Sequence, residues 1–171
     1  MKVWGDLQKL SDGDCVSTVK KCSYDESNKV YLIDSNKVAI DFDIVSEKLT
    51  STLGVSKPRS MDCLYVEDSE LVLVEFKNKR RIEGKLKEDI KLKIYASLAL
   101  LKYCYQLGKD EIAEIIIVKK GGISVQTSVE IGLHFDKMAN SSCPTWLKFI
   151  EKTHGIKISM MNQDDYLKRL I

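Results

Sequence analysis

The chain has 171 residues, a length that suits one domain with a sizeable core. Its apolar content of 44% and charged content of 30% are ordinary for a globular protein, and its net charge of +2 excludes a bulk electrostatic attraction to nucleic acid. The longest apolar run, Ile94–Leu101, is too short to span a bilayer, and the N-terminus has no apolar signal-peptide region. We therefore expect a cytoplasmic protein with no membrane partner.

Residues 1–42 are predicted to form an N-terminal extension. Its first part, residues 1–28, is polar and irregular, apart from a short helix near Trp4. Two strands, at 29–34 and 37–42, are predicted to pair as a hairpin around a Ser-Asn turn.

A predicted core, residues 43–135, begins with a helix that Asp43 can cap and Gly54 can end. Two extended segments, 62–67 and 71–77, then flank an Asp-Ser turn, so a second hairpin is predicted.

Polar side chains are predicted to gather at one end of this second hairpin. Glu75 and Lys77 lie two residues apart and therefore share a face of the strand. Because the start of the first strand lies beside the end of the second, Asp62 is predicted to meet them. Two carboxylates and an amine at one sheet edge are typical of a metal site with a base.

A strand-helix-strand unit is predicted after this hairpin. A helix over 85–107, stopped by Gly108, leads to a buried strand at 114–119, which implies that this strand runs parallel to 71–77. The fold class is therefore predicted as α/β, with a mixed central sheet flanked by helices. The residues of the helix predicted to face the sheet are Leu86, Ile90, Ile94, Leu98 and Leu101.

The rest of the chain is predicted to hold two more strands, at 123–129 and 131–135, and a helical tail over 136–171. Within the tail we expect an amphipathic helix at 142–153, followed by a short strand and a short helix.

Asp62, twelve further residues and then Glu75-Phe76-Lys77 resemble the motif of the PD-(D/E)xK nuclease superfamily, with Met61 where the motif has proline. The resemblance implies a single nuclease-like domain with a restriction-endonuclease-like core. It also implies that Asp62, Glu75 and the Phe76 carbonyl hold Mg²⁺, for which Mn²⁺ can substitute, while Lys77 positions or activates the attacking water. Such a site would hydrolyse phosphodiester bonds of DNA, with RNA as the alternative.

The residue types suit this chemistry. A Mg²⁺ ion held by carboxylates lowers the pKa of its water and offsets the charge that develops on phosphoryl oxygens. The alternative is a Glu75–Lys77 ion pair on an exposed sheet. However, Glu75 ends a run too apolar for a solvent-facing strand, and burying a carboxylate near another is costly without a cation.

The resemblance extends to further candidate residues. Glu47, on the helix before the motif, is a candidate metal ligand, although a solvated helix residue is the alternative. Lys91 and Tyr95, one helical turn apart, partly match a Gln-x-x-x-Tyr pair of one exonuclease branch, with lysine in place of glutamine; a surface lysine beside a half-buried tyrosine is the alternative.

Residues 77–93 hold eight Lys or Arg against three acidic residues, and are predicted to bind backbone phosphates without reading sequence, unless they form a basic loop with no partner. The predicted contacts in this run include Lys79, Arg80, Arg81 and Lys85.

The sequence thus predicts a Mg²⁺-dependent endo- or exonuclease. The main alternative is a nuclease-fold protein that binds nucleic acid or a protein partner without cutting, and a weaker one is an immunity or inhibitor protein. A homodimer is a further expectation, because one small domain covers only a few base pairs.

Overall fold

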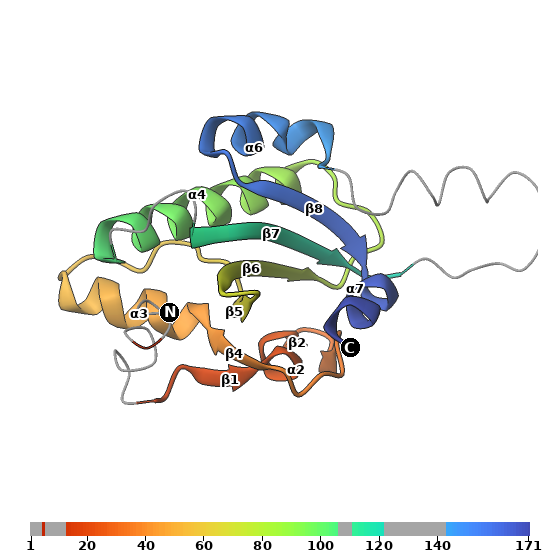
Figure 1. The fold of residues 1–171 in the computed structure, drawn as a ribbon, viewed down its shortest axis with the longest axis horizontal. Helices are drawn as coiled ribbons and strands as arrows, with labels where there is room; N and C mark the ends of the chain where they lie inside the picture. Colours follow the sequence, from red (N-terminus) through yellow and green to blue (C-terminus); the bar gives the residue numbers. More distant parts are fainter. Residues whose placement is uncertain (1–4, 6–12, 106–110, 122–142) are drawn as a thin grey trace, which may run out of the picture.

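The computed structural model describes residue 5 and residues 13–105, 111–121 and 143–171. The described strands form a six-stranded sheet, in the order β1-β4-β5-β6-β7-β8, and a separate sheet of β2 and β3 (Figure 1). Helices pack on both faces of the larger sheet, so the predicted α/β class is confirmed.

The strands are β1 (Val16–Thr18), β2 (Tyr24–Asp25), β3 (Val30–Tyr31), β4 (Val38–Asp41), β5 (Cys63–Glu67), β6 (Glu70–Lys77), β7 (Ile112–Lys119) and β8 (Lys157–Asn162). The helices are α2 (Val19–Cys22), α3 (Phe42–Thr52), α4 (Lys85–Tyr105), η2 (Thr145–Leu147), α6 (Lys148–His154) and α7 (Gln163–Leu170).

The predicted hairpin at the centre of the sheet is confirmed. β5 and β6 pair antiparallel, and Glu67 faces Glu70 across the turn. The two turn residues, Asp68 and Ser69, have φ angles of 48° and 69°. Positive φ at both positions belongs to the tight turn whose twist matches that of the flanking strands.

The predicted crossover through α4 is also confirmed. β6 pairs with β7 in parallel, and β8 continues the sheet in parallel beyond β7. In Figure 1, α4 and α6 lie along the same side of these strands. Of the five predicted sheet-facing positions on α4, Leu86 is only partly buried; the buried ones are Ile90, Ile94, Leu98 and Leu101.

Side chains of the central strands alternate between two cores. Leu64 and Leu73 pack with residues of α3, α4 and α6, whereas Tyr65 and Val74 pack with residues of α2 and α7. Because strand side chains alternate with a period of two, Glu75 has the parity of Leu73 and lies on the α4 face.

The predicted hairpin of 29–34 with 37–42 is wrong. β3 pairs with β2 in the small sheet, and β4 lies between β1 and β5 in the large one. The reason is that both faces of β4 are apolar: Ala39 packs in one core and Ile40 in the other. An isolated two-stranded hairpin cannot bury both of these faces, whereas a place within the larger sheet can. Residues predicted as an extension therefore supply two strands of the main sheet.

The cap of α3 is a second correction. Asp41, not Asp43, accepts hydrogen bonds at the helix start, from the backbone N–H groups of Asp43 and Ile44 at 3.1 and 3.2 Å. β4 ends at Asp41, which is therefore still extended, as an N-cap residue must be. The Gly54 that follows α3 has a φ of 67°, a left-handed geometry suited to ending a helix.

Some predicted elements lie outside the described residues: the helix near Trp4, the stop at Gly108 and the strands at 123–129 and 131–135. The predicted helix at 142–153 corresponds to η2 and α6, and the predicted final strand and helix correspond to β8 and α7. Among the described helices, none is both long enough and apolar enough to cross a membrane.

A charged network fixes α7 against the sheet at the end opposite Lys77. Arg169 Nη1 lies 2.6 Å from an oxygen of Glu114, and Arg169 also donates to Glu67. Burial acts to raise the pKa of each carboxyl, but hydrogen bonds and the charge of Arg169 outweigh it, so both pKa values lie below the ordinary 4.5. Stability from this network is therefore fully present above about pH 4.5 and is lost as the pH falls through the lowered values.

We expect Arg169→Ala to lower the free energy of unfolding by about 2 kcal/mol at neutral pH, and by less at about pH 3, where both carboxyls gain protons. Urea unfolding at the two pH values measures this difference. Lys168→Ala is the matched control, because Lys168 is 77% exposed and pairs with Asp165 at only 3.7 Å. A loss for Arg169→Ala that is equal at both pH values would contradict the assignment.

Candidate active site

Asp62, Glu75 and Lys77 meet at one end of the sheet, on the α4 face. Asp62 directly precedes β5, and the register that pairs Cys63 with Val74 places it opposite Glu75. Lys77 Nζ lies 2.5 Å from Glu75 Oε1. The backbone N–H of Phe76 donates to Asp62 Oδ2 at 2.7 Å, which fixes this carboxylate beside the end of β6.

Lys93 is a fourth member of this cluster and was not among the predicted site residues. Its Nζ lies 2.9 Å from Asp62 Oδ1 and 2.8 Å from Glu75 Oε1, so the amine bridges the two carboxylates. Asp89, one turn earlier on α4, lies 3.7 Å from Lys77 Nζ, and Ser97, one turn later, accepts a hydrogen bond from the Met61 N–H. The spacing of 89, 93 and 97 is a polar i, i+4, i+8 stripe that could have identified this face.

Lys91 and Tyr95 do not join the cluster. Each lies two residues from Lys93, about 200° around the helix axis. Lys91 Nζ contacts Glu88 at 2.9 Å, and the Tyr95 ring lies 5.9 Å from the ring of His154 on α6. Lys91 and Tyr95 therefore do not form, at this site, the pair that their partial match to the exonuclease motif predicted.

Within the cluster Glu75 is buried, whereas Asp62, Lys77 and Lys93 are partly exposed. The Glu75 side chain is fully buried, and burial, followed by the charge of Asp62, raises its pKa to about 8 although Lys93 and Lys77 oppose the shift. Burial acts to lower the pKa of Lys93, but Glu75 and Asp62 outweigh it and the pKa is raised. The arrangement therefore favours a positive charge between the two carboxyl groups.

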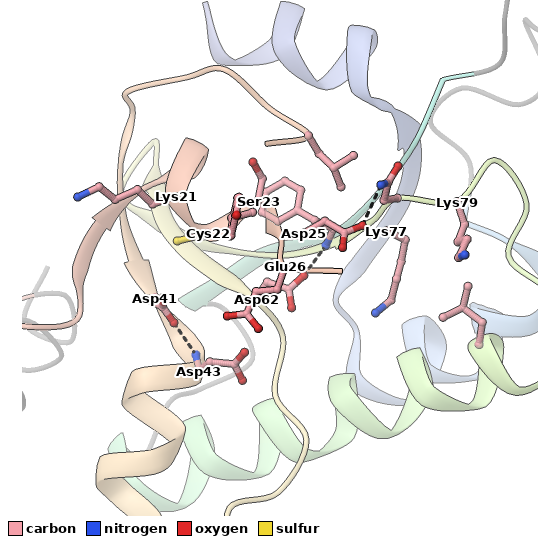
Figure 2. Close-up of a pocket in the computed structure, with 15 residues that line it drawn as sticks. Lys21, Cys22, Ser23, Asp25, Glu26, Asp41, Asp43, Asp62, Lys77 and Lys79 are labelled. Carbon is pink, nitrogen blue, oxygen red and sulfur yellow. Dashed lines mark hydrogen bonds between the residues drawn. The ribbon is translucent and has the colours of Figure 1, made fainter. Parts of the chain in front are cut away.

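An open pocket of about 550 Å³ adjoins the cluster, and both Asp62 and Lys77 line it. In the view of Figure 2, Asp41, Asp43 and Asp62 lie toward one side and Lys77 toward the other. Asp43 is held in place by Ser60 Oγ at 2.5 Å. These acidic groups give the pocket a surplus of negative charge that attracts cations.

Glu47 is not among the residues that line the pocket. It is exposed and lies one turn beyond Asp43 on α3, so the carboxyl groups that this part of the chain offers to the pocket are those of Asp41 and Asp43. Burial raises the pKa of Asp41, although its bonds to the start of α3 oppose the shift.

The predicted basic run begins at the pocket and continues over the surface beside it. Lys79 lines the pocket, whereas Arg80, Arg81 and Lys85 are exposed in the loop and first turn that lead into α4. Lys119 Nζ lies 3.5 Å from the Arg80 carbonyl oxygen, which ties this loop to the end of β7. The run therefore extends from the pocket wall over the exposed surface beside it.

The oxygen atoms at the cluster suit Mg²⁺, which takes one or two carboxylates and keeps several waters. Asp62 and Glu75 would supply the carboxylates. Glu75 Oε1 receives no well-directed hydrogen bond among the described residues, although two amines lie within ion-pair distance. The Phe76 carbonyl points toward the same side of β6 as its N–H, toward Asp62. No group of three His, Cys, Asp or Glu side chains arranged to hold a metal occurs within the described ranges.

Comparisons with protein-family models, with curated proteins and with solved structures found no match to this chain.

Proposed function

We propose that this chain is a metal-dependent nuclease that hydrolyses phosphodiester bonds of DNA, with RNA as the alternative substrate. The observation that carries the proposal is the meeting of Asp62, Glu75 and Lys77 beside an open pocket, with Glu75 fully buried. A buried carboxyl next to a second one is costly, and proteins tolerate that cost chiefly at functional sites.

The surrounding elements support a restriction-endonuclease-like core. An antiparallel hairpin carries the two carboxylates, α4 follows it, and β7 returns parallel to β6. This is the order of strands and helix that the superfamily resemblance implies for the region from β5 to β7.

Each residue has a distinct proposed role. Asp62, Glu75 and the Phe76 carbonyl would hold a divalent ion, which when bound supplies an acidified water and offsets charge on the phosphoryl oxygens. Lys77 orients the attacking water and the scissile phosphate, because its Nζ is held 2.5 Å from Glu75 Oε1 at the pocket wall. Lys79 would hold the adjacent phosphate.

The position of Lys93 favours a second candidate. Its amine lies within 2.9 Å of both carboxylates, between the groups that would hold the ion. If the amine stays there, it replaces the divalent ion, and the chain would bind nucleic acid or a protein partner without cutting.

Cleavage assays decide between the two candidates. We expect the chain to cleave at least one of linear, circular, single-stranded and branched DNA in Mg²⁺ or Mn²⁺, and to cleave none in EDTA. The Glu75→Gln variant, which keeps the shape of the side chain, should bind the same substrate without cutting it. Cleavage that persists in EDTA, or that Glu75→Gln retains, would refute a metal-dependent nuclease site at Glu75. Binding without cleavage under every metal condition would support the second candidate.

A further inference from the structure

The small sheet of β2 and β3 forms the wall of the pocket that faces the candidate active site. The lining residues from this segment are Lys21, Cys22, Ser23, Tyr24, Asp25, Glu26 and Leu32. Asp25, Glu26 and Asp62 all line this pocket (Figure 2). The pocket volume of about 550 Å³ is in the range of about 300–1,000 Å³ that holds small ligands, which is enough for one nucleotide unit.

This wall presents aromatic rings to solvent. Tyr24 is 42% exposed and Tyr31 is 52% exposed, and their ring centroids lie 4.8 Å apart across the β2–β3 pair. By contrast, the tyrosines at 65 and 166 are fully buried in the core. A cross-strand aromatic pair contributes roughly 0.2–1 kcal/mol to a sheet. That contribution to the sheet does not require either ring to line a pocket. Tyr24 nevertheless lines this one.

The aromatic wall is fixed relative to the candidate active site. Asn78, which directly follows Lys77, donates from its side chain to Asp25 Oδ2 at 2.8 Å. Ser23 is buried and exchanges hydrogen bonds with the backbone of Ile33, at 3.0 and 3.3 Å. Tyr24, between Ser23 and Asp25, is therefore held at a set position beside the end of β6.

We propose that Tyr24, backed by Tyr31, stacks on an unpaired nucleobase whose phosphodiester lies at Asp62 and Lys77. This inference rests on the proposed function and names its substrate class: single-stranded nucleic acid, or a single-stranded end or gap. The faces of paired bases are covered by their neighbours in a duplex, so a flat ring at the pocket wall can engage only an unstacked base. Aromatic stacking is sequence-tolerant because every base presents such a face.

Binding of short labelled oligonucleotides, followed by fluorescence anisotropy in Ca²⁺, tests the proposal without relying on cleavage. We expect single strands to bind more tightly than blunt duplexes. DNA and RNA strands are tested separately, to show which nucleic acid supplies the base. Tyr24→Ala should weaken single-strand binding by about 5- to 150-fold, the range for loss of one base stack. Tyr24→Phe should retain it, because phenylalanine keeps the ring.

Tyr103→Ala is the matched control, because Tyr103 is 76% exposed and lies roughly 27 Å along α4 from Lys85. Circular dichroism establishes that each variant is folded. Unchanged single-strand affinity in folded Tyr24→Ala, or wild-type affinity for blunt duplex equal to that for single strands, would overturn the stacking proposal even if the chain cleaves DNA. A selective loss in Tyr24→Ala would uphold it even if the chain cleaves nothing, and only the nuclease proposal would then fall.

Discussion

Replacing Lys77 with methionine is expected to reduce metal-dependent cleavage by about 10²- to 10⁴-fold, the usual contribution of a positioned proton-transfer group. The amine lies 2.5 Å from Glu75 Oε1 and lines the pocket, so the proposed function gives it contact with both the attacking water and the phosphate. Methionine keeps the length of the side chain and removes its charge. Single-turnover cleavage measured at saturating Mg²⁺ isolates the effect on the chemical step.

Lys102→Met is the matched control for this experiment. Lys102 is also a lysine near the α4 side of the molecule, but it is exposed in the last turn of the helix, far from the pocket. We expect its cleavage rate to match that of the wild type. Oligonucleotide binding and circular dichroism of Lys77→Met show whether the fold and the substrate site survive. A folded, substrate-binding Lys77→Met protein with the wild-type rate would refute the role assigned to Lys77.

Replacing Lys93 with methionine is expected to make the stability of the fold depend on divalent cations. Without the bridging amine, Asp62 and Glu75 lose the positive charge that lies 2.9 and 2.8 Å from them. Removing one partner of a buried ion pair costs about 3–5 kcal/mol, which corresponds to a fall in melting temperature of roughly 6–20 °C for a chain of this size. Thermal unfolding in EDTA measures this loss.

Added Mg²⁺ or Mn²⁺ should then restore stability to Lys93→Met, because an ion that binds only the folded state stabilises it by about 2.7 kcal/mol at a hundred times its Kd. Lys91→Met is the control: Lys91 is on the opposite side of α4, and its ion pair among the described residues is with Glu88, a contact worth about 0.2–0.5 kcal/mol. Equal unfolding curves for Lys93→Met with EDTA and with saturating metal would refute a cation position between the two carboxylates.

The wild-type response to metal separates the two candidate functions. If Mg²⁺ raises the melting temperature of the wild type, the ion displaces the Lys93 amine and the site can operate as a nuclease. If Mg²⁺ raises the melting temperature of Lys93→Met but not of the wild type, the Lys93 amine stays between the two carboxylates. Binding without cutting is then the better description of the protein. Under the proposed function, the choice between cutting and binding without cutting depends on whether a divalent ion displaces the Lys93 amine.

Local sequence patterns determined the centre of the fold. The apolar run before Glu75 and the Asp-Ser turn specified the β5–β6 hairpin, because alternation and turn chemistry act over a few residues. The spacing of Ile90 and Ile94 specified the buried side of α4 for the same reason. The meeting of Asp62, Glu75 and Lys77 followed from these local rules, since hairpin register links the two strand ends.

Contacts between distant segments could not be derived in this way. Val38–Asp41 has the composition of any short strand, and only the two cores that bury its opposite faces place it between β1 and β5. Lys91 and Lys93 have the same side chain two residues apart, and the rotation of α4 against the sheet decides which of them reaches Asp62.

The sequence by itself therefore determined the α/β class, the central hairpin and the gathering of two carboxylates with an amine, because each depends on the period of one element or the register of one turn. Only the tertiary structure decided that Lys93 bridges those carboxylates and that Tyr24, from the β2–β3 segment, lines the pocket. Both depend on how separate elements rotate and pack against one another, which is set by the burial of apolar surface over the whole domain rather than by any local pattern.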